Sequence, residues 1–382
     1  MRKLFTYAFI LTILLGGCTN DAGNDRSAGS LESASWPVFR GDSGLTGVAD
    51  VRIPGDPVLL WSFDTGSSIV SSPVIGHGCV YISALNGSVH SLGLSDGKKK
   101  WEYGTGDDIE ASPLLLDDTV YIGNLSGLFV ALDALSGELR WKYEIGGDIM
   151  GSANWSTLPG GERQVLVGSY DSRMYAFDAA TGRLRWTYET GYYINGAPAT
   201  DGDIVVFGGC DEKLHIVSAS DGVKRGEVVA GSYIAGSAAL VDDRAYIGHY
   251  GGRLVCIDIE GQNIAWEYGD RQSGEFFSSP AVGGERVYIG SRDRSLHCVD
   301  RETGAALWIF RTRGDVDSSP VVADGKVVFA SADGRLYCAG AENGEEIWSY
   351  EIGSPVTGCP AVVEGMIVVG AGDGRVYAFD MR

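Results

Sequence analysis

The sequence predicts an all-β protein, an eight-bladed β-propeller whose blades are four-stranded antiparallel sheets. Three observations lead to this prediction: a tryptophan recurs with a period of about 40 residues, each repeat contains four short strand signals, and the last repeat lacks a fourth strand. A period of roughly 40 to 50 residues built from strands is typical of propellers rather than of helical solenoids.

Seven tryptophans mark the repeat and follow one another at steps of 40, 40, 45, 80, 42 and 40 residues. Gly226 stands in the middle of the double step, where a further tryptophan is missing, so we expect eight units. Each ring should lie on the outermost strand and be wedged against the next blade, where it buries apolar area between diverging sheets. The predicted docking residues are Trp61, Trp101, Trp141, Trp186, Trp266, Trp308 and Trp348.

The repeat that starts at Trp308 shows the strand pattern. Apolar or alternating runs at 316–322, 326–330 and 335–339 are separated by Asp-Gly pairs, and an Asn-Gly pair precedes a fourth run at 347–350. Such pairs supply the positive φ angles that two-residue hairpins need. Each unit is therefore predicted to hold four antiparallel strands joined by tight turns.

The two ends of the repeat region are complementary. The last repeat ends after the run 376–380, whereas the run 58–63 around Trp61 has the pattern of a fourth strand with no blade before it. We expect this N-terminal strand to complete the last blade, because ring closure removes exposed sheet edges. The upstream segment 36–41 is expected to pack against the rim or one face of the ring.

The first residues have the composition of an export signal. Arg2 and Lys3 precede the apolar run 4–15, which is shorter than the roughly 20 residues of a membrane span. Small residues then lead to Cys18, in a pattern that resembles a lipobox; an ordinary signal peptide is the alternative. We expect a signal peptide at 1–17, a lipidated N-terminus and flexible linker at 18–35, and the propeller at 36–382.

The predicted lipidation of Cys18 implies an exported protein anchored at the cell envelope. It would lie on the periplasmic side of the outer membrane in a host with two membranes, and on the outer cell surface otherwise. The formal net charge of −20 argues against nucleic acid as a partner and against electrostatic adhesion to anionic lipid. Membrane attachment would therefore depend on the acyl chain alone.

The remaining cysteines and the histidines are predicted to be structural. The cysteines at 256, 298 and 338 fill one repeat position on neighbouring blades about 10 Å apart, whereas a disulfide requires Cα atoms within roughly 7 Å. His90, His215 and His297 replace the tyrosines found at 337 and 377, again at one position around the ring. Side chains spread in this way do not converge on one metal ion, so no metal site is expected.

The repeat unit, with W-x-Y-x-x-G, S-P-x-V, V-Y-I-G and G-x-L-Y-A-x-D-x-x-T-G, resembles the quinoprotein-type, or PQQ-like, propeller repeat over residues 36–382. The run WPVFRG at 36–41 resembles the opening of many exported proteins of this group. The resemblance implies two functional branches. One contains quinoprotein alcohol dehydrogenases, which hold PQQ and calcium in the propeller axis; the other contains lipoproteins similar to BamB, a barrel-assembly scaffold of the bacterial outer membrane.

The residues favour the second branch. The dehydrogenase branch carries an adjacent cysteine pair, a tryptophan platform and a catalytic aspartate beside calcium ligands, whereas this chain has no adjacent cysteines and only Trp155 to serve as a platform. We expect a noncatalytic scaffold with protein partners in the envelope, such as barrel-assembly components, and no cofactor. The alternatives are a PQQ-dependent oxidoreductase with calcium, and a sensor module that binds a ligand or glycan.

Positions that vary between repeats define a candidate binding face. Pairs that begin at 69, 109, 149, 194, 234, 276, 316 and 356 have an apolar first member, expected between blades, and a variable second member, expected to face the channel. Turns between second and third strands should carry basic residues on the same face. Charged groups around an aromatic mouth could recognise a peptide strand or an unfolded segment; solvated turn chemistry is the alternative. The candidates are Asp107, Asp108, Glu110, Asp148, Tyr192, Tyr193, Tyr233, Phe277, Asp315, Asp317, Arg173, Lys213, Arg253, Arg335 and Arg375.

Overall fold

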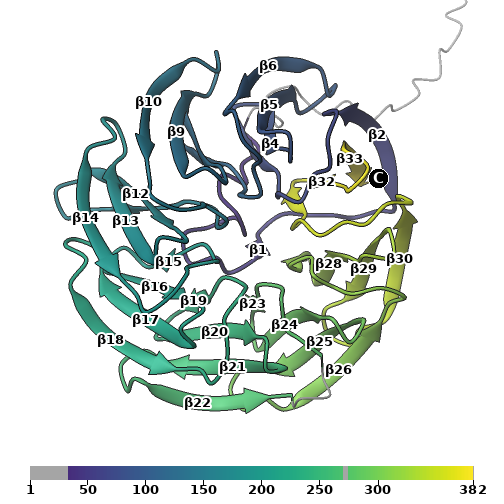
Figure 1. Ribbon diagram of the computed structural model, residues 1–382. Coiled ribbons are helices and arrows are strands. Elements are labelled where there is room, and N and C mark those ends of the chain that lie inside the picture. The colour runs from purple at the N-terminus through teal and green to yellow at the C-terminus, as the bar shows by residue number, and fades with distance from the viewer. Residues whose placement is uncertain (1–32, 270–273, 382) are drawn as a thin grey trace, which may run out of the picture.

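A computed structural model describes residues 33–269 and 274–381, which form eight sheets arranged in a ring around one axis (Figure 1). Seven of the sheets have four strands and one has five. The regular elements within these ranges are strands, so the predicted all-β, eight-bladed propeller is confirmed. Among the described residues no helix is long and apolar enough to cross a membrane. The predicted signal peptide and Cys18 lie outside the described residues.

Each of the first four blades runs from an innermost strand at the axis to an outermost strand at the rim. Blade 1 contains β3 (Val74–Gly76), β4 (Cys79–Ser83), β5 (Ser88–Gly93) and β6 (Lys99–Gly104). Blade 2 contains β7 (Leu114–Leu116), β8 (Thr119–Gly123), β9 (Leu128–Asp133) and β10 (Leu139–Glu144). Blade 3 contains β11 (Asn154–Thr157), β12 (Arg163–Gly168), β13 (Arg173–Asp178) and β14 (Leu184–Glu189). Blade 4 contains β15 (Ala199–Thr200), β16 (Ile204–Gly208), β17 (Lys213–Ser218) and β18 (Lys224–Val229).

The other four blades repeat this order, with two additions from the N-terminal part of the chain. Blade 5 contains β19 (Ala239–Val241), β20 (Arg244–His249), β21 (Arg253–Asp258) and β22 (Asn263–Tyr268). Blade 6 contains β23 (Ala281–Gly283), β24 (Arg286–Ser291), β25 (Ser295–Asp300) and β26 (Ala306–Arg311). Blade 7 contains β1 (Val48–Ala49), β27 (Val321–Ala323), β28 (Lys326–Ala330), β29 (Arg335–Gly340) and β30 (Glu346–Glu351). Blade 8 contains β31 (Ala361–Val363), β32 (Met366–Gly370), β33 (Arg375–Met381) and β2 (Pro57–Asp64).

The predicted strands of one repeat agree with β28, β29 and β30 to within one residue, but the predicted first strand at 316–322 was wrong at its start. The observed β27 begins at Val321. Pro320 has no backbone N–H to donate, and the two serines before it bond to neighbouring blades instead. Ser319 Oγ accepts from the backbone N–H of Ser279, and Ser318 Oγ donates to the carbonyl of Gly358.

The docking tryptophans join each blade to the next. The indole nitrogen of Trp101 donates to the carbonyl of Ala134 at 2.8 Å, and Gly137 of the same turn lies against the ring. A Cβ atom at Gly137 would stand 2.7 Å from the indole, so this turn position requires glycine. The same bond to the following blade is made by Trp61, Trp141, Trp186, Trp266 and Trp308.

Two blade junctions depart from this rule. At Gly226 the space of the missing ring is filled by the side chain of Gln262, whose Nε2 donates to the carbonyl of Arg225. At Trp348 the indole nitrogen is buried without a partner among the described residues. Blade 8 has no hairpin between its third and fourth strands, since β2 comes from the other end of the chain.

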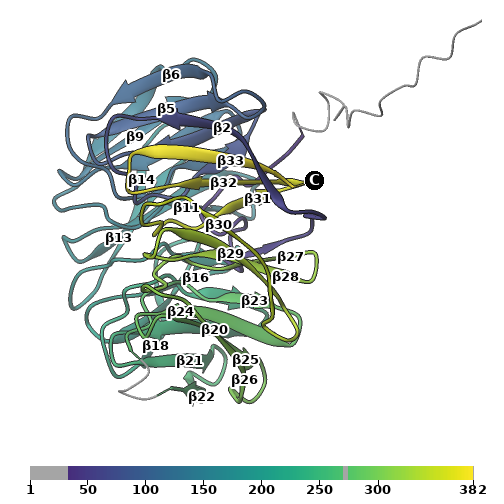
Figure 2. The same ribbon diagram turned by 90° about the vertical axis from the view of Figure 1, so that its right-hand side faces the viewer.

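The ring closes as the sequence predicts. Strand β2 pairs antiparallel with β33, with Val58 opposite Asp380 and Asp64 opposite Arg375. The purple N-terminal strand and the yellow C-terminal strand therefore lie side by side in one blade (Figure 2). Blade 8 therefore has the same four-stranded order, from the axis to the rim, as the other blades.

Residues 36–53, which we call the hub segment, cross one face of the ring and bond to the innermost hairpin of every blade. Backbone bonds join Trp36 to Ile75 in both directions, and β1 pairs in parallel with β27. The sequence predicted packing on the rim or one face, and it is the face. Hub carbonyls accept from Leu115, Asn154, Thr200, Leu240, Val282, Val322 and Gly365, which belong to blades 2 to 8 in that order.

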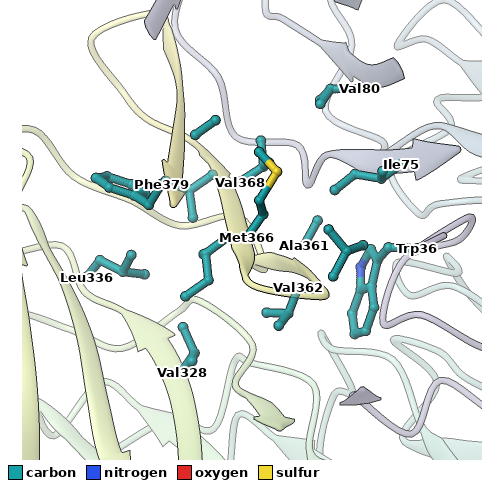
Figure 3. Packing of buried hydrophobic residues seen from close by; sticks show 14 of the residues in the cluster. Trp36, Ile75, Val80, Val328, Leu336, Ala361, Val362, Met366, Val368 and Phe379 are labelled. Carbon is teal, nitrogen blue, oxygen red and sulfur yellow. The ribbon is translucent and has the colours of Figure 1, made fainter. Parts of the chain in front are cut away.

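The hub segment is anchored in the core at two places. The Trp36 ring packs in a buried cluster with Ile75, Val362 and Met366 (Figure 3). The Arg40 guanidinium is completely buried and donates to the carbonyls of Pro320 and Pro280 at 2.5 and 2.7 Å. A buried cation without a carboxylate beside it is stable only where several acceptors replace its water. Proline carbonyls at the axis supply these acceptors.

The docking geometry predicts different effects for two glycine-to-alanine substitutions. Gly137 has φ of +74° and Gly325 has φ of +69°, so both substitutions carry the same backbone strain, but open space surrounds Gly325. Gly137→Ala also forces a methyl group against Trp101, and we expect it to lower the free energy of unfolding by about 1 to 3 kcal/mol more than Gly325→Ala. Denaturant unfolding of both variants measures the difference, and equal losses would contradict the proposed role of the turn glycine.

The buried guanidinium makes the hub segment sensitive to one substitution. Arg40→Met leaves the carbonyls of Pro280 and Pro320 buried without donors, and each such group costs roughly 1 to 3 kcal/mol. We expect a loss of about 2 to 6 kcal/mol of unfolding free energy in urea titrations. Arg52→Met, in the same segment but exposed, is the matched control and should change stability little.

Candidate functional site

A pocket of about 260 Å³ lies on the propeller axis. Its wall contains the variable member of all eight pairs, as the sequence predicts, whereas each apolar first member is at most 1% exposed and packs between blades. Phe39 of the hub segment also lines the pocket, so the hub closes the base of this axial pocket. The eight variable residues in its wall are Val70, Glu110, Met150, Asn195, Ala235, Phe277, Asp317 and Thr357.

A belt of serine side chains surrounds the axial pocket. The Oγ of Ser112 accepts from the backbone N–H of Ser72 at 2.8 Å, and the Oγ of Ser72 accepts from Cys359 of blade 8. The belt makes such bonds at six blade junctions and is interrupted where alanine stands at 197 and cysteine at 359. The serine of the S-P-x-V motif therefore ties neighbouring blades together at the axis, a role that the sequence analysis did not assign.

The mouth face carries the loops that link one blade to the next and the turns between second and third strands, as the sequence predicts. Backbone bonds from Leu125 to Asp108 and from Tyr170 to Asp148 join the two kinds of loop. The opposite face of the ring, which we call the hub face, carries the turns between first and second strands. The axial pocket opens toward the mouth face, since Tyr170 follows β12 and lines its wall.

One side of the mouth is aromatic. Tyr193 stacks on Tyr170 with ring centroids 4.6 Å apart and an angle of 4° between the planes, and Tyr192 lies 4.3 Å from Tyr193. Tyr192 and Tyr233 are about half exposed, at 49% and 50%. We call these residues, with two that line the pocket beside them, the aromatic arc: Tyr170, Tyr192, Tyr193, Tyr233, Tyr250 and Phe277.

The other side of the mouth is acidic. Asp107, Asp108 and Glu110 lie in the loop before blade 2, and Asp148 lies in the loop before blade 3. None of these four carboxylates has an ion-pair partner within the described ranges. Burial raises the pKa of Glu110, and the charges of Asp108 and Asp148 raise it further. The pocket wall therefore holds a carboxylate whose charged form is not compensated.

The two predicted acidic residues before blade 7 have a different environment. Asp317 lines the pocket, and its oxygens accept from Nε and Nη2 of Arg292 at 3.0 and 3.1 Å. The same guanidinium bonds to Glu275 and lies over the Phe277 ring, 4.2 Å from its centroid. Asp315 accompanies Asp317 in this loop, where its carbonyl accepts from Ser331. Arg292 thus links the aromatic and acidic parts of the mouth, although its turn position gave no signal in the sequence.

The structure does not bring the five predicted basic side chains into the pocket wall. Each instead forms an ion pair with an acidic residue on the adjacent outermost strand, and such exposed pairs contribute little. Where an aspartate stands two residues before the basic residue, it stabilises the turn. Asp333, for example, accepts from the backbone N–H of Arg335 and from the hydroxyl of Tyr337. The pairs are Arg173 with Glu189, Lys213 with Glu227, Arg253 with Glu267, Arg335 with Glu351, and Arg375 with Asp64.

The histidines occupy the tyrosine position of other blades, as the sequence predicts. His215 Nε2 lies 3.0 Å from Asp211, and its Nδ1 lies 3.2 Å from the hydroxyl of Tyr188. His297 makes the same two contacts, with an aspartate of its own blade and a tyrosine on the outermost strand of the preceding blade. Among the described residues no group of three or more His, Cys, Asp or Glu side chains is placed to hold a metal, and the six described cysteines are free.

The pocket wall does not fit PQQ, the cofactor that this fold suggests. PQQ carries three carboxylates, which bind most strongly to cationic groups. The described wall contains Glu110 and Asp317 but no lysine or arginine, so its charge would repel such an anion. Trp155, the one candidate platform, lies on β11 under the guanidinium of Arg163 at 5.2 Å and outside the wall. It belongs to the longer hairpin of blade 3.

Comparison with known proteins gives one family and many similar folds. A family model described as outer membrane protein assembly factor BamB matches residues 56–222, 111–310, 266–337 and 292–382. The search of curated proteins found no match. Solved structures with the same fold include BamB from Moraxella catarrhalis, at 21% identity and a TM-score of 0.71, covering 85% of this chain and all of that one. Quinohemoprotein alcohol dehydrogenase from Comamonas testosteroni is similar at 14% identity and a TM-score of 0.78, covering 93% and 81%.

The environment of Glu110 predicts a pH-dependent effect on stability. A carboxyl whose pKa is raised by folding holds its proton more tightly in the folded state, so the protein loses stability as pH rises above the ordinary value of 4.5. Glu110→Gln removes this loss, and we expect its melting temperature to exceed that of the parent protein by roughly 1 to 2 °C at pH 7.

The same comparison at low pH provides the check. At a pH well below 4.5 both forms carry a neutral side chain, and the difference in melting temperature should disappear. Glu138→Gln is the matched control, because Glu138 belongs to the same blade but is exposed in a turn on the hub face. A gain that persists unchanged in acid would show that the charge of Glu110 is not its cause.

Proposed function

The chain belongs to the family of outer membrane protein assembly factor BamB, and from this premise we propose that it is a noncatalytic scaffold for protein partners in the cell envelope. The proposal includes a role in the assembly of outer-membrane β-barrel proteins. Its partners are envelope proteins, among them components of the barrel-assembly machinery, and nucleic acid is not among them.

The aromatic arc is the observation that carries this proposal. Tyr192 and Tyr193 stand on one inter-blade segment and Tyr233 on the next, and the three side chains are 38% to 50% exposed. Exposed aromatic rings bury large apolar areas when they bind a partner. Aromatic residues are enriched among the anchors of protein interfaces. An arc of tyrosines beside acidic side chains supports recognition of a peptide strand or an unfolded segment better than a catalytic role.

The N-terminal part of the chain supports an anchored scaffold. We propose that residues 1–17 are a signal peptide, that Cys18 carries the lipid and that residues 18–35 form the linker, with the protein held at the outer membrane on its periplasmic side. The hub segment that follows lies on the face opposite to the mouth. An anchor that enters the propeller at the hub face leaves the mouth face free for a partner.

The oxidoreductase alternative has weaker support. The likeness to the alcohol dehydrogenase, at 14% identity, concerns the fold, and a fold alone does not carry a reaction. The described pocket wall is acidic and includes one cysteine, Cys359, so it offers no counterpart to an adjacent cysteine pair. We therefore propose no cofactor, and PQQ with calcium belongs to the alternative alone.

Cross-linking in envelopes tests the scaffold proposal. We expect the lipidated protein to capture barrel-assembly components, identified by mass spectrometry, and the variant Tyr192→Ala/Tyr193→Ala/Tyr233→Ala to capture at least about tenfold less, because interface anchors each contribute about 2 kcal/mol or more. The matched control is Leu139→Ala/Leu184→Ala/Ile309→Ala, which removes exposed apolar side chains from the rim strands.

Three outcomes bear on the scaffold proposal. Loss of capture in the tyrosine variant with normal capture in the rim variant would support the mouth face as the interface. Equal capture by all forms would show that the interface lies outside the mouth face. Absence of barrel-assembly components, in an organism that has them, would reject the assembly role, and a Cys18→Ala variant reports how far capture depends on the anchor.

A further inference from the structure

The axial pocket has a chemical character that the scaffold proposal does not use. It is a blind pocket, closed at the base by Phe39 and open at the mouth face. Its volume of about 260 Å³ is below the range of roughly 300 to 1,000 Å³ found for drug-sized ligands. A small molecule or a single long side chain is therefore the size of occupant that fits.

The charges around the pocket determine whether it attracts a cation or an anion. Glu110 is partly buried in the wall and lacks an ion-pair partner in the described part of the chain, with Asp108 and Asp148 close enough to raise its pKa. Arg292, which lies outside the described wall, is shared between the wall residue Asp317 and Glu275, so its charge is compensated. The described wall contains no lysine or arginine, so an anion would be repelled and a cation attracted.

The uncharged part of the wall is also suited to a cation. The rings of Tyr170 and Tyr250 line the pocket, and aromatic faces attract cations within about 6 Å. Glu110 is the acceptor that an N–H donor inside the pocket would meet, whereas the side-chain oxygen of Asn195 is buried away from the accessible space.

A metal ion does not satisfy these groups. No set of three acidic, histidine or cysteine side chains among the described residues converges on one point, whereas metal sites need at least that many ligands. An organic ammonium group needs fewer, because it donates up to three hydrogen bonds and its alkyl part packs against apolar wall such as Val70, Met150 and Phe39.

We propose that the axial pocket binds a primary ammonium group on an alkyl chain, with Glu110 as its counter-ion and the rings of Tyr170 and Tyr250 beside it. Two sources supply this chemistry. One is a free small amine. The other is the side chain of a lysine inserted by a protein partner bound at the mouth face, and this second source rests on the proposed scaffold function.

Calorimetric titration of the purified full chain in detergent tests the proposal. We expect n-butylamine to bind once per chain, and n-butanol and butyrate, which match its size, not to bind. Glu110→Gln should lower the affinity for butylamine by at least about tenfold, since a charge-assisted hydrogen bond is lost. Glu138→Gln, in the same blade but on the hub face, should bind as the parent does, and circular dichroism confirms that both variants are folded.

A peptide arm separates the two sources. N-acetyl-Gly-Lys-Gly-amide binding more tightly than butylamine, with no binding of its norleucine analogue, assigns the pocket to a partner's lysine; the reverse order assigns it to a free amine. Binding of butyrate or calcium in place of butylamine, absence of amine binding, or an unchanged affinity in Glu110→Gln would overturn the proposal. Because these titrations contain no partner protein, their failure is distinguishable from a failure of capture in envelopes.

Discussion

The contact between a tryptophan of one blade and the turn of the next is the interaction on which the rest of the structure depends. The indole of Trp101, for example, donates to the carbonyl of Ala134, and its ring covers Gly137. The position of each blade is set in this way by the blade before it. Repeated around the ring, this contact fixes the spacing of the innermost strands. The serine belt and the axial pocket exist only because eight innermost strands meet at that spacing.

The hub segment makes the two faces of the ring structurally different. The hub segment bonds to every blade and places Phe39 at the base of the pocket, which closes the axis on that side. The groups available for binding at the axis therefore lie on the mouth face, where the loop residues vary between repeats. The aromatic arc and the unpaired carboxylates lie there, and each belongs to a loop that bears no part of the docking contact.

The fold was predictable from the sequence because its signals repeat: tryptophan, turn glycine and strand alternation occur in nearly every unit. The pocket wall was predictable for the same reason, since variable positions stand out against a constant frame. The hub's many contacts were not, because most are backbone hydrogen bonds between Trp36–Arg52 and distant strands, without a side-chain pattern in the sequence. The basic residues were assigned to the mouth from their turn, but β-strand pairing placed acidic neighbours such as Glu189 beside them. Arg292 occurs in one blade only and left no repeat to notice.

The hub segment also determines how the molecule responds to tension. A pull on the N-terminal end reaches Trp36 first, and the next residues are held by hydrogen bonds to one blade after another and by the buried guanidinium of Arg40. The bonds of the hub segment therefore bear the load before the closure between β2 and β33 at the rim does. Because the hub segment precedes β2 in the chain, tension on the N-terminal end has to break the hub's hydrogen bonds before it can peel β2 from β33.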